Sequence, residues 1–176
     1  MIEGNKTRMP MKIFAVDPGP TQSAFVIYEN HCILDKSILP NEELLRKIRE
    51  YPREKTLLAV EMIASYGMPV GADVFETVLW IGRFIEAWKD EYRLIYRREV
   101  KIEICGTMEA KDANIRQALI DLFPRTGGGK TPQIGTKKDP GPLYGVVKDI
   151  WSALGVAVTT QRILNRCSTS QNATPA

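Results

Sequence analysis

The chain has 176 residues, of which 44% are hydrophobic, and a formal net charge of +3. This length and composition predict one domain with its own hydrophobic core. No apolar run reaches the roughly 20 residues that a membrane-spanning helix needs, and residues 1–11 lack the apolar stretch of a signal peptide. We therefore expect a cytoplasmic protein with no membrane segment.

Cysteine and histidine are too scarce to build several common kinds of site. The three cysteines, Cys32, Cys105 and Cys167, are far apart and fit neither a disulfide framework nor a thiolate zinc site. His31 is the single histidine, which leaves almost nothing for Ser/His/Asp catalysis or an HExxH zinc site. A metal ion would have to be held by oxygen ligands, which favour Mg²⁺ or Mn²⁺.

The first three predicted strands are consecutive. Residues 12–17 are apolar until Asp17, and after a short turn residues 22–30 and 31–39 continue with strand-like composition. Short connections between strands are typical of antiparallel neighbours. These segments therefore predict an antiparallel meander.

A helix and a fourth strand follow the meander. Residues 41–50 carry an apolar stripe at helical spacing, which predicts a helix that covers one face of the sheet. Residues 56–63 predict a strand that is reached through this helix. The usual right-handed crossover would place this strand parallel to the first one.

Two apolar strands end on a carboxylate. The first strand stops at Asp17 and the fourth at Glu61. Strands this apolar are typical of a sheet covered on both faces, and such sheets bind ligands beyond the carboxyl ends of their strands. Parallel pairing would make Asp17 and Glu61 neighbours, so this edge of the sheet is the place for a metal ion.

The second half of the chain predicts alternating helices and one more strand. Residues 73–92 predict a long helix with Asp73 as its N-terminal cap. Residues 100–106 alternate between apolar and polar and predict a strand. Residues 108–123 predict a helix that Thr107 would cap.

A long loop separates that helix from the last one. Residues 124–142 hold glycines, prolines and lysines without an apolar period, which predicts a loop. Its GGGKT sequence does not fit a Walker A motif, because Pro124 stands where the first glycine is required. Residues 143–164 predict a final helix and residues 167–176 a disordered tail. We thus expect a flexible extension over 1–11 and a domain over 12–166.

The predicted helix at 73–92 has two apolar stripes. One stripe consists of Phe75, Val78, Leu79, Gly82 and Ile85, and the other of Val74, Ile81, Phe84 and Trp88. A helix that lies on a sheet needs only one. The second could meet another helix of the same chain or a symmetric partner across a twofold axis.

Basic residues gather at a few positions. They are Arg97 and Arg98, Lys111, and the loop lysines Lys130, Lys137 and Lys138. This pattern is compatible with an anionic partner such as nucleic acid, and equally with ordinary solvated faces.

Asp149 is a third candidate ligand. It lies at the margin of the apolar stripe of the last predicted helix, with Ser152 one turn later. A helix packed beside the first strand would bring Asp149 toward Asp17 and Glu61, although an acid there could also be mere surface charge. Three carboxylates at one point stay ionised only if a cation neutralises them. Ions held in this way activate water for attack on phosphorus.

Four segments follow one another in the order typical of one family. They are VDPGPTQSAFVIY at 16–28, AVEMI at 59–63, AKDANIRQAL at 110–119 and KDIWSALGVAV at 148–158. They resemble the first hairpin, the strand ending in glutamate, the lysine-led helix and the final helix of RuvC-like Holliday junction resolvases, in the RNase H-like nuclease superfamily. The resemblance spans about residues 12–160. It implies an α/β, RNase H-like fold with a mixed five-stranded sheet flanked by helices on both faces.

The resemblance also implies roles for individual residues. Asp17, Glu61 and Asp149 match the catalytic metal ligands, and Lys111 matches a contact to DNA or phosphate. The implied cofactor is Mg²⁺, for which Mn²⁺ would substitute, with two ions per subunit.

One position departs from the family pattern. Ser152 stands where the family usually has a second acid on the last helix. Its neutral hydroxyl would be the fourth ligand, or another acid such as Asp139 or Asp73 would take that place. The number of bound ions is therefore left open.

The implied activity is that of a structure-selective DNA endonuclease in recombination and repair. Such an enzyme is a homodimer that makes paired symmetric nicks in four-way or branched DNA by metal-dependent phosphodiester hydrolysis, here with residues 73–92 as the candidate interface. The DNA contacts would include Lys130, Lys137, Lys138, Arg97 and Arg98. Two alternatives remain: an RNase H-fold nuclease for flaps, forks or RNA/DNA hybrids, and a module that binds junctions without cutting them.

Overall fold

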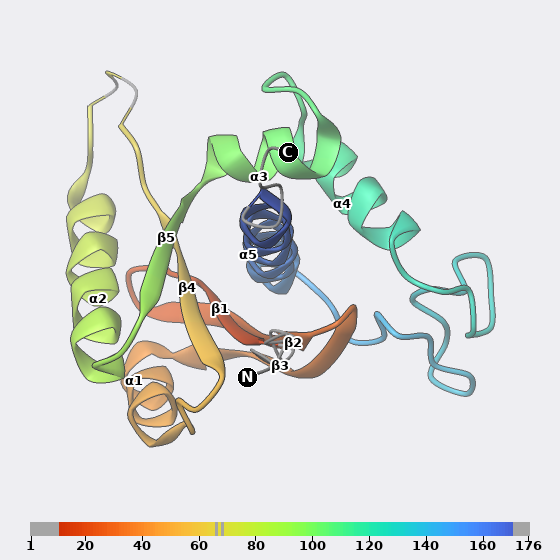
Figure 1. Cartoon of the computed structure of the whole chain (residues 1–176), viewed down its shortest axis with the longest axis horizontal. Helices are drawn as coiled ribbons and strands as arrows, with labels where there is room; N and C mark the ends of the chain where they lie inside the picture. The colour runs from red at the N-terminus through yellow and green to blue at the C-terminus, as the bar shows by residue number, and fades with distance from the viewer. Residues whose placement is uncertain (1–10, 66, 68, 171–176) are drawn as a thin grey trace, which may run out of the picture.

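A mixed five-stranded sheet forms the centre of the computed structural model, which describes residues 11–65, 67 and 69–170 (Figure 1). The strands lie side by side in the order β3-β2-β1-β4-β5. Residues 1–10 of the predicted extension and 171–176 of the predicted tail lie outside the described residues.

The predicted meander and the parallel fourth strand are both confirmed. Strands β1 (Lys12–Asp17), β2 (Gln22–Glu29) and β3 (Cys32–Pro40) pair antiparallel in succession. Helix α1 (Asn41–Glu50) then leads to β4 (Thr56–Met62), which pairs parallel with β1. The two strands that end on a carboxylate are therefore direct neighbours.

The fifth strand lies earlier in the chain than predicted. After α2 (Ala72–Trp88) the chain forms β5 (Tyr92–Tyr96), parallel to β4, and the segment predicted as a strand belongs to α3 (Arg97–Cys105). The alternating apolar residues misled the prediction. In a strand, Val100, Ile102 and Ile104 would share one face, whereas here Val100 and Ile104 are buried one helical turn apart and Ile102 is 47% exposed.

The last two helices are shifted relative to the prediction. Helix α4 (Asp112–Asp121) is shorter, and α5 (Ile150–Ser170) begins seven residues later than position 143. Gly145 and Lys148 have positive φ angles of 79° and 47°, which a helix cannot include. The helix continues to Ser170, so it contains the start of the predicted tail.

Two predicted caps are also wrong. Gly71 is the N-cap of α2, and Asp73 lies inside the first turn. Helix α4 starts after Lys111, where the side chain of Asn114 accepts a hydrogen bond from the Lys111 backbone N–H. The Thr107 hydroxyl instead accepts a hydrogen bond from the backbone N–H of Glu109, upstream of α4.

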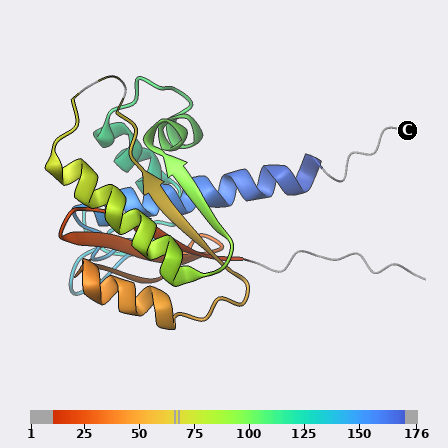
Figure 2. The same ribbon diagram turned by 90° about the vertical axis from the view of Figure 1, so that its left-hand side faces the viewer.

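The sheet separates two apolar layers (Figures 1 and 2). Ile13 and Ala15 face α3, α4 and α5, while Phe14 and Val16 face α1 and α2. This alternation explains why β1 reads as continuously apolar, since both of its faces are buried. Helix α5 lies between the sheet and the α3–α4 pair, and it extends past the sheet in Figure 2. Within the described residues, no helix is long and apolar enough to cross a membrane.

Helix α2 buries one of its two predicted stripes. Ile81, Phe84 and Trp88 lie in the core, whereas Phe75 and Leu79 are 65% and 59% exposed. Leu45 and Arg49 of α1 line the groove beside the exposed stripe without covering it. The outer face of α2 is thus apolar and open.

Candidate metal and nucleic-acid site

The site is built around the ends of β1 and β4. Parallel pairing aligns Val16 with Val60, so the next residues, Asp17 and Glu61, lie side by side at the carboxyl ends of the two strands. Their side chains are hydrogen-bonded to each other, and the Glu61 side chain is 14% exposed. The sequence prediction that these two acids meet is therefore confirmed.

A buried polar network shapes the turn after Asp17. The hydroxyl of Ser23 accepts a hydrogen bond from the Gly19 N–H and donates one of 2.6 Å to Asn41 Oδ1. Asn41 Nδ2 in turn donates to the Gly19 carbonyl at 2.8 Å. A side chain at Gly19 would approach the Gln22 carbonyl oxygen to 2.4 Å, so only glycine fits. This network fixes the point at which β1 ends.

Without a bound cation, the surroundings of the two acids favour a proton shared by the pair. Burial, reinforced by the negative charges of Glu61 and Asp149, raises the pKa of Asp17 to about 8. Burial also raises the pKa of Glu61, against the opposing effects of Arg97 and of the hydrogen bond with Asp17. The surroundings of the acid pair therefore favour its protonation, most strongly at Asp17.

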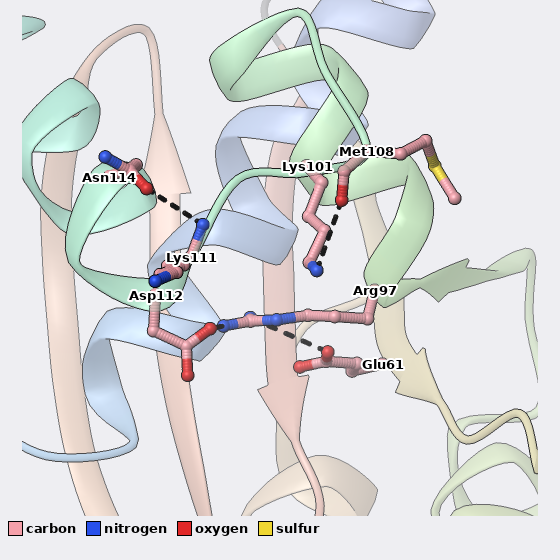
Figure 3. A network of polar contacts seen from close by, with 7 residues as sticks. All are labelled: Glu61, Arg97, Lys101, Met108, Lys111, Asp112 and Asn114. Atoms are coloured by element: carbon pink, nitrogen blue, oxygen red, sulfur yellow. Dashed lines mark hydrogen bonds and ion pairs between the residues drawn. The ribbon is translucent and has the colours of Figure 1, made fainter.

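Arg97 connects this acid pair to α4. Its Nη1 lies 3.7 Å from Glu61 Oε1, and its Nη2 donates a 2.5 Å hydrogen bond to Asp112 Oδ1. Figure 3 shows the Arg97 side chain extended between the two carboxylates. Arg97 is the first residue of α3, directly after β5, so the parallel β4–β5 pair places it beside Glu61.

Two connected pockets surround these residues. The first, of about 390 Å³, is lined by Asp17, Glu61 and Ser152, together with Arg97 and Asp112. The second is a larger groove of about 810 Å³ that shares Arg97, Asp112 and Ser152. The acid pair thus opens onto a groove large enough for part of an extended ligand.

Asp149 lies in the larger groove. It immediately precedes α5, where its backbone carbonyl accepts a hydrogen bond from the Ala153 N–H, and its side chain is exposed. The left-handed backbone of Lys148 turns the chain just before it. The negative charge of Asp149 contributes to the raised pKa of Asp17, but Asp149 does not line the smaller pocket.

The donor set of the smaller pocket fits a hard divalent cation. Asp17 and Glu61 offer carboxylate oxygens, Ser152 offers a hydroxyl, and burial together with the neighbouring negative charges raises the pKa of Asp17, so a cation would favour its ionised form. No group of three or more acids, histidines or cysteines among the described residues lies close enough to hold an ion as the side chains stand. Asp73 and Asp139, the other acids considered, are exposed and do not line this pocket.

Of the predicted DNA contacts, Arg97 lines the groove, while Lys111 and Lys130 are each next in sequence to a residue that lines it. Lys111 is exposed at the start of α4, next to Asp112, and Arg98 is exposed with its guanidinium over the Tyr96 ring. Lys130, Lys137 and Lys138 are exposed in the glycine-rich loop, which also supplies Thr131 and Ile134 to the wall of the larger groove.

That loop is a folded unit held by its own backbone. Gly128 donates a hydrogen bond to the Asp139 carbonyl, and Gly141 donates one to the Ile134 carbonyl. Gly141 is packed so closely that a side chain would come within 2.2 Å of the Pro132 carbonyl oxygen. The three loop lysines are therefore presented from an ordered support.

The sequence interpretation missed Asp112 and the true position of Arg97. It treated Arg97 as one of several peripheral basic residues because it placed the fifth strand at 100–106. The available signal was the run YRLIY at 92–96, whose aromatic and β-branched residues favour a strand and which ends next to Arg97. Assigning this run to the sheet would have put Arg97 at a strand end beside Glu61.

Comparison with solved structures identifies the fold. The Thermus thermophilus RuvC structure superposes with a TM-score of 0.62 and 16% identity, covering 89% of this chain and 97% of that one. T. thermophilus RuvC in complex with Holliday junction substrate gives a TM-score of 0.58 and 15% identity, covering 89% and 96%.

The chain has a RuvC-like fold. The expected RNase H-like architecture, with its sheet order β3-β2-β1-β4-β5 and helices on both faces, is thereby confirmed. No protein-family model matches the chain, and no curated protein matches it in sequence. The three-dimensional structure thus confirms the RuvC-like fold that the four sequence segments implied.

Proposed function

We propose that this protein is a metal-dependent endonuclease that acts on branched DNA, with four-way junctions as the preferred substrate. The observation that carries the proposal is the partly buried acid pair Asp17–Glu61, which opens onto a groove in a RuvC-like fold. A similar solved structure is T. thermophilus RuvC in complex with Holliday junction substrate.

In the proposed reaction, each residue of the site has a defined task. A bound Mg²⁺ or Mn²⁺ would supply an activated water and polarise the phosphodiester. Asp17 and Glu61 would hold the ion once Asp17 has lost its proton, and Asp149 would add negative charge from just before α5. Ser152 contributes a neutral hydroxyl, so this chain offers less negative charge than a site with a fourth acid.

A second candidate is a junction-binding protein that does not cut. The observation in its favour is that no three-acid group is arranged for a metal among the described residues. Metal-binding acids commonly reorganise when the ion arrives, because their mutual repulsion is then removed. We therefore place the nuclease first.

The experiment that separates these functions uses end-labelled substrates. We expect paired, symmetric nicks near the centre of a four-way junction in Mg²⁺ or Mn²⁺ and none in EDTA. Faster cutting of a fork, a flap or an RNA/DNA hybrid would transfer the assignment to those substrates. Tight junction binding without cutting in either metal would establish the binding module.

The homodimer is part of the proposal, and its interface is the outer face of α2. Leu79 is 59% exposed in the apolar stripe, next to Phe75 and Val78. We expect Leu79→Glu to weaken dimerisation by about 100-fold or more, because the substitution buries an unpaired carboxylate at the interface. Sedimentation analysis would show a dimeric wild type and a monomeric variant.

Leu34 provides a matched control, on the edge strand β3 of the sheet. Leu34 of β3 is 51% exposed and lies outside the α2 face, so Leu34→Glu should leave the dimer intact. If Leu79→Glu remains dimeric while it stays folded, α2 is not the interface.

The loop lysines are expected to bind the DNA backbone. Replacing Lys130, Lys137 and Lys138 together with glutamine should remove about three phosphate contacts, which lowers the slope of log K against log salt by roughly 2 to 3. Lys89, exposed at the end of α2, provides the control as Lys89→Gln. Junction-binding titrations at several salt concentrations test this. An unchanged slope would remove the loop from the DNA interface.

A further inference from the structure

Arg97 is a basic residue in a pocket that is otherwise acidic. Its guanidinium lies among acids, 3.7 Å from Glu61 and hydrogen-bonded to Asp112. Among the described residues that line the acid pocket, Arg97 is the only cation, whereas Asp17, Glu61 and Asp112 are all acidic. A DNA phosphate that approaches this pocket would meet mainly negative charge apart from Arg97 and any bound metal.

The contacts of Arg97 leave much of its binding capacity unused. A guanidinium carries five N–H donors arranged as a planar fork. Within the described part of the chain, one of its nitrogens is hydrogen-bonded, to Asp112, and the contact with Glu61 is an ion pair at a longer distance. The Arg97 side chain is 28% exposed and lines both pockets. Free donors therefore face the space that a ligand would enter.

Stability does not explain this arrangement. The Asp112 side chain is 84% exposed, and ion pairs with an exposed partner contribute little to folding. What the pair does is fix the direction of the arginine, because Asp112 holds the guanidinium at the junction of the two pockets (Figure 3). A fixed fork of this kind matches the oxygens of a phosphate group.

We infer that Arg97 is a catalytic residue that binds the phosphate of the scissile bond, and that Asp112 is the residue that positions it. Before DNA and metal bind, the guanidinium offsets the charge of Glu61. When they bind, Glu61 turns to the ion, and the open donors of Arg97 bind a non-bridging phosphate oxygen. This inference rests on the proposed function, since it assumes a phosphodiester substrate.

The test compares Arg97→Gln with wild type in three measurements on the full chain. Junction affinity in EDTA should fall about tenfold and the cleavage rate about 100-fold or more, because a charge-assisted phosphate contact is lost. Affinity for Mn²⁺ without DNA should instead rise severalfold, since a positive charge beside Glu61 has been removed. Arg46, exposed on α1, gives the matched control as Arg46→Gln, which should change none of these.

Asp112 is tested through a double-mutant cycle. Asp112→Ala alone should slow cleavage about tenfold, and it should have no further effect when Arg97 is already glutamine, because it acts through that residue. If the double variant loses cleavage rate by the product of the two single effects, Asp112 does not position Arg97. If Arg97→Gln fails to fold, Arg97→Lys replaces it in the test. A lysine ammonium lacks the planar fork of N–H donors, so we expect this variant to cut the junction about tenfold more slowly than wild type.

The outcomes separate this inference from the function on which it rests. A wild type that neither binds nor cuts junctions overturns both. An active wild type with an Arg97→Gln variant of equal junction affinity and rate overturns the role of Arg97 alone. A lower Mn²⁺ affinity in Arg97→Gln would show that Arg97 merely holds the acids in place, and would also overturn it.

Discussion

Asp17→Asn is expected to abolish DNA cleavage and, at the same time, to stabilise the metal-free protein at pH 8. Cleavage should fall by at least about a thousandfold, since the metal loses one of its two buried ligands. Stability should rise by on the order of 1 to 2 kcal/mol, because a buried carboxyl with a pKa of about 8 is replaced by a neutral amide that can still donate a hydrogen bond to Glu61.

Junction cleavage assays and urea unfolding in EDTA measure the two effects. The control is Glu43→Gln, which removes an exposed acid of α1 and should alter neither. A variant that cuts at the wild-type rate would show that Asp17 is not a ligand. A less stable variant would show that other groups in the folded protein stabilise the ionised carboxylate of Asp17.

The metal-free protein should lose stability as the pH rises from 5 to 8. The folded-state pKa of Asp17, about 8, lies above the ordinary value of 3.8, so the folded chain binds this proton more tightly than the unfolded chain. The associated stabilisation is complete at acidic pH, is lost progressively as the pH rises toward 8, and is absent above that. At about 1.4 kcal/mol per pH unit, the loss is on the order of 3 kcal/mol.

Unfolding titrations at several pH values measure this loss directly. Mg²⁺ or Mn²⁺ should restore stability at pH 8 and do little at pH 5, because the ion competes with the proton for Asp17. The pH dependence should nearly vanish in Asp17→Asn. A wild type that is equally stable at pH 5 and pH 8 in EDTA would contradict the shared-proton description of the acid pair.

The core of the sheet could be predicted from the sequence because its signals are local. The apolar runs that end on Asp17 and Glu61, and the single helix between them, dictate both a parallel pair and adjacent carboxylates. The outer stripe of α2 was also visible, because a helix on a sheet buries only one face.

The remaining elements depend on contacts between distant segments. In isolation, the segment that holds Val100, Ile102 and Ile104 fits a strand as well as a helix. Its packing against α4 and α5 determines that it is a helix. The start of α5 is set by the left-handed residues Gly145 and Lys148, and lysine gives no sequence signal for such a backbone.

The residues of the site divide in the same way, into those with a local sequence signal and those that depend on contacts between distant segments. Asp17 and Glu61 were found at strand ends, whereas the Arg97–Asp112 pair joins residues 15 positions apart and forms only because β5 lies beside β4. Asp149 was expected on the last helix, gathered with Asp17 and Glu61, but it precedes α5 and does not line the pocket of the acid pair. Ser152 was expected in the site, and it does line the pocket of the acid pair.

The most direct test of the central claim is anomalous diffraction from crystals of the wild-type protein soaked in Mn²⁺. The account predicts a manganese peak bound by carboxylate oxygens of both Asp17 and Glu61, at the ends of β1 and β4, and its loss in Asp17→Asn. Manganese peaks only at other positions, with Asp17 and Glu61 still hydrogen-bonded to each other, would contradict it.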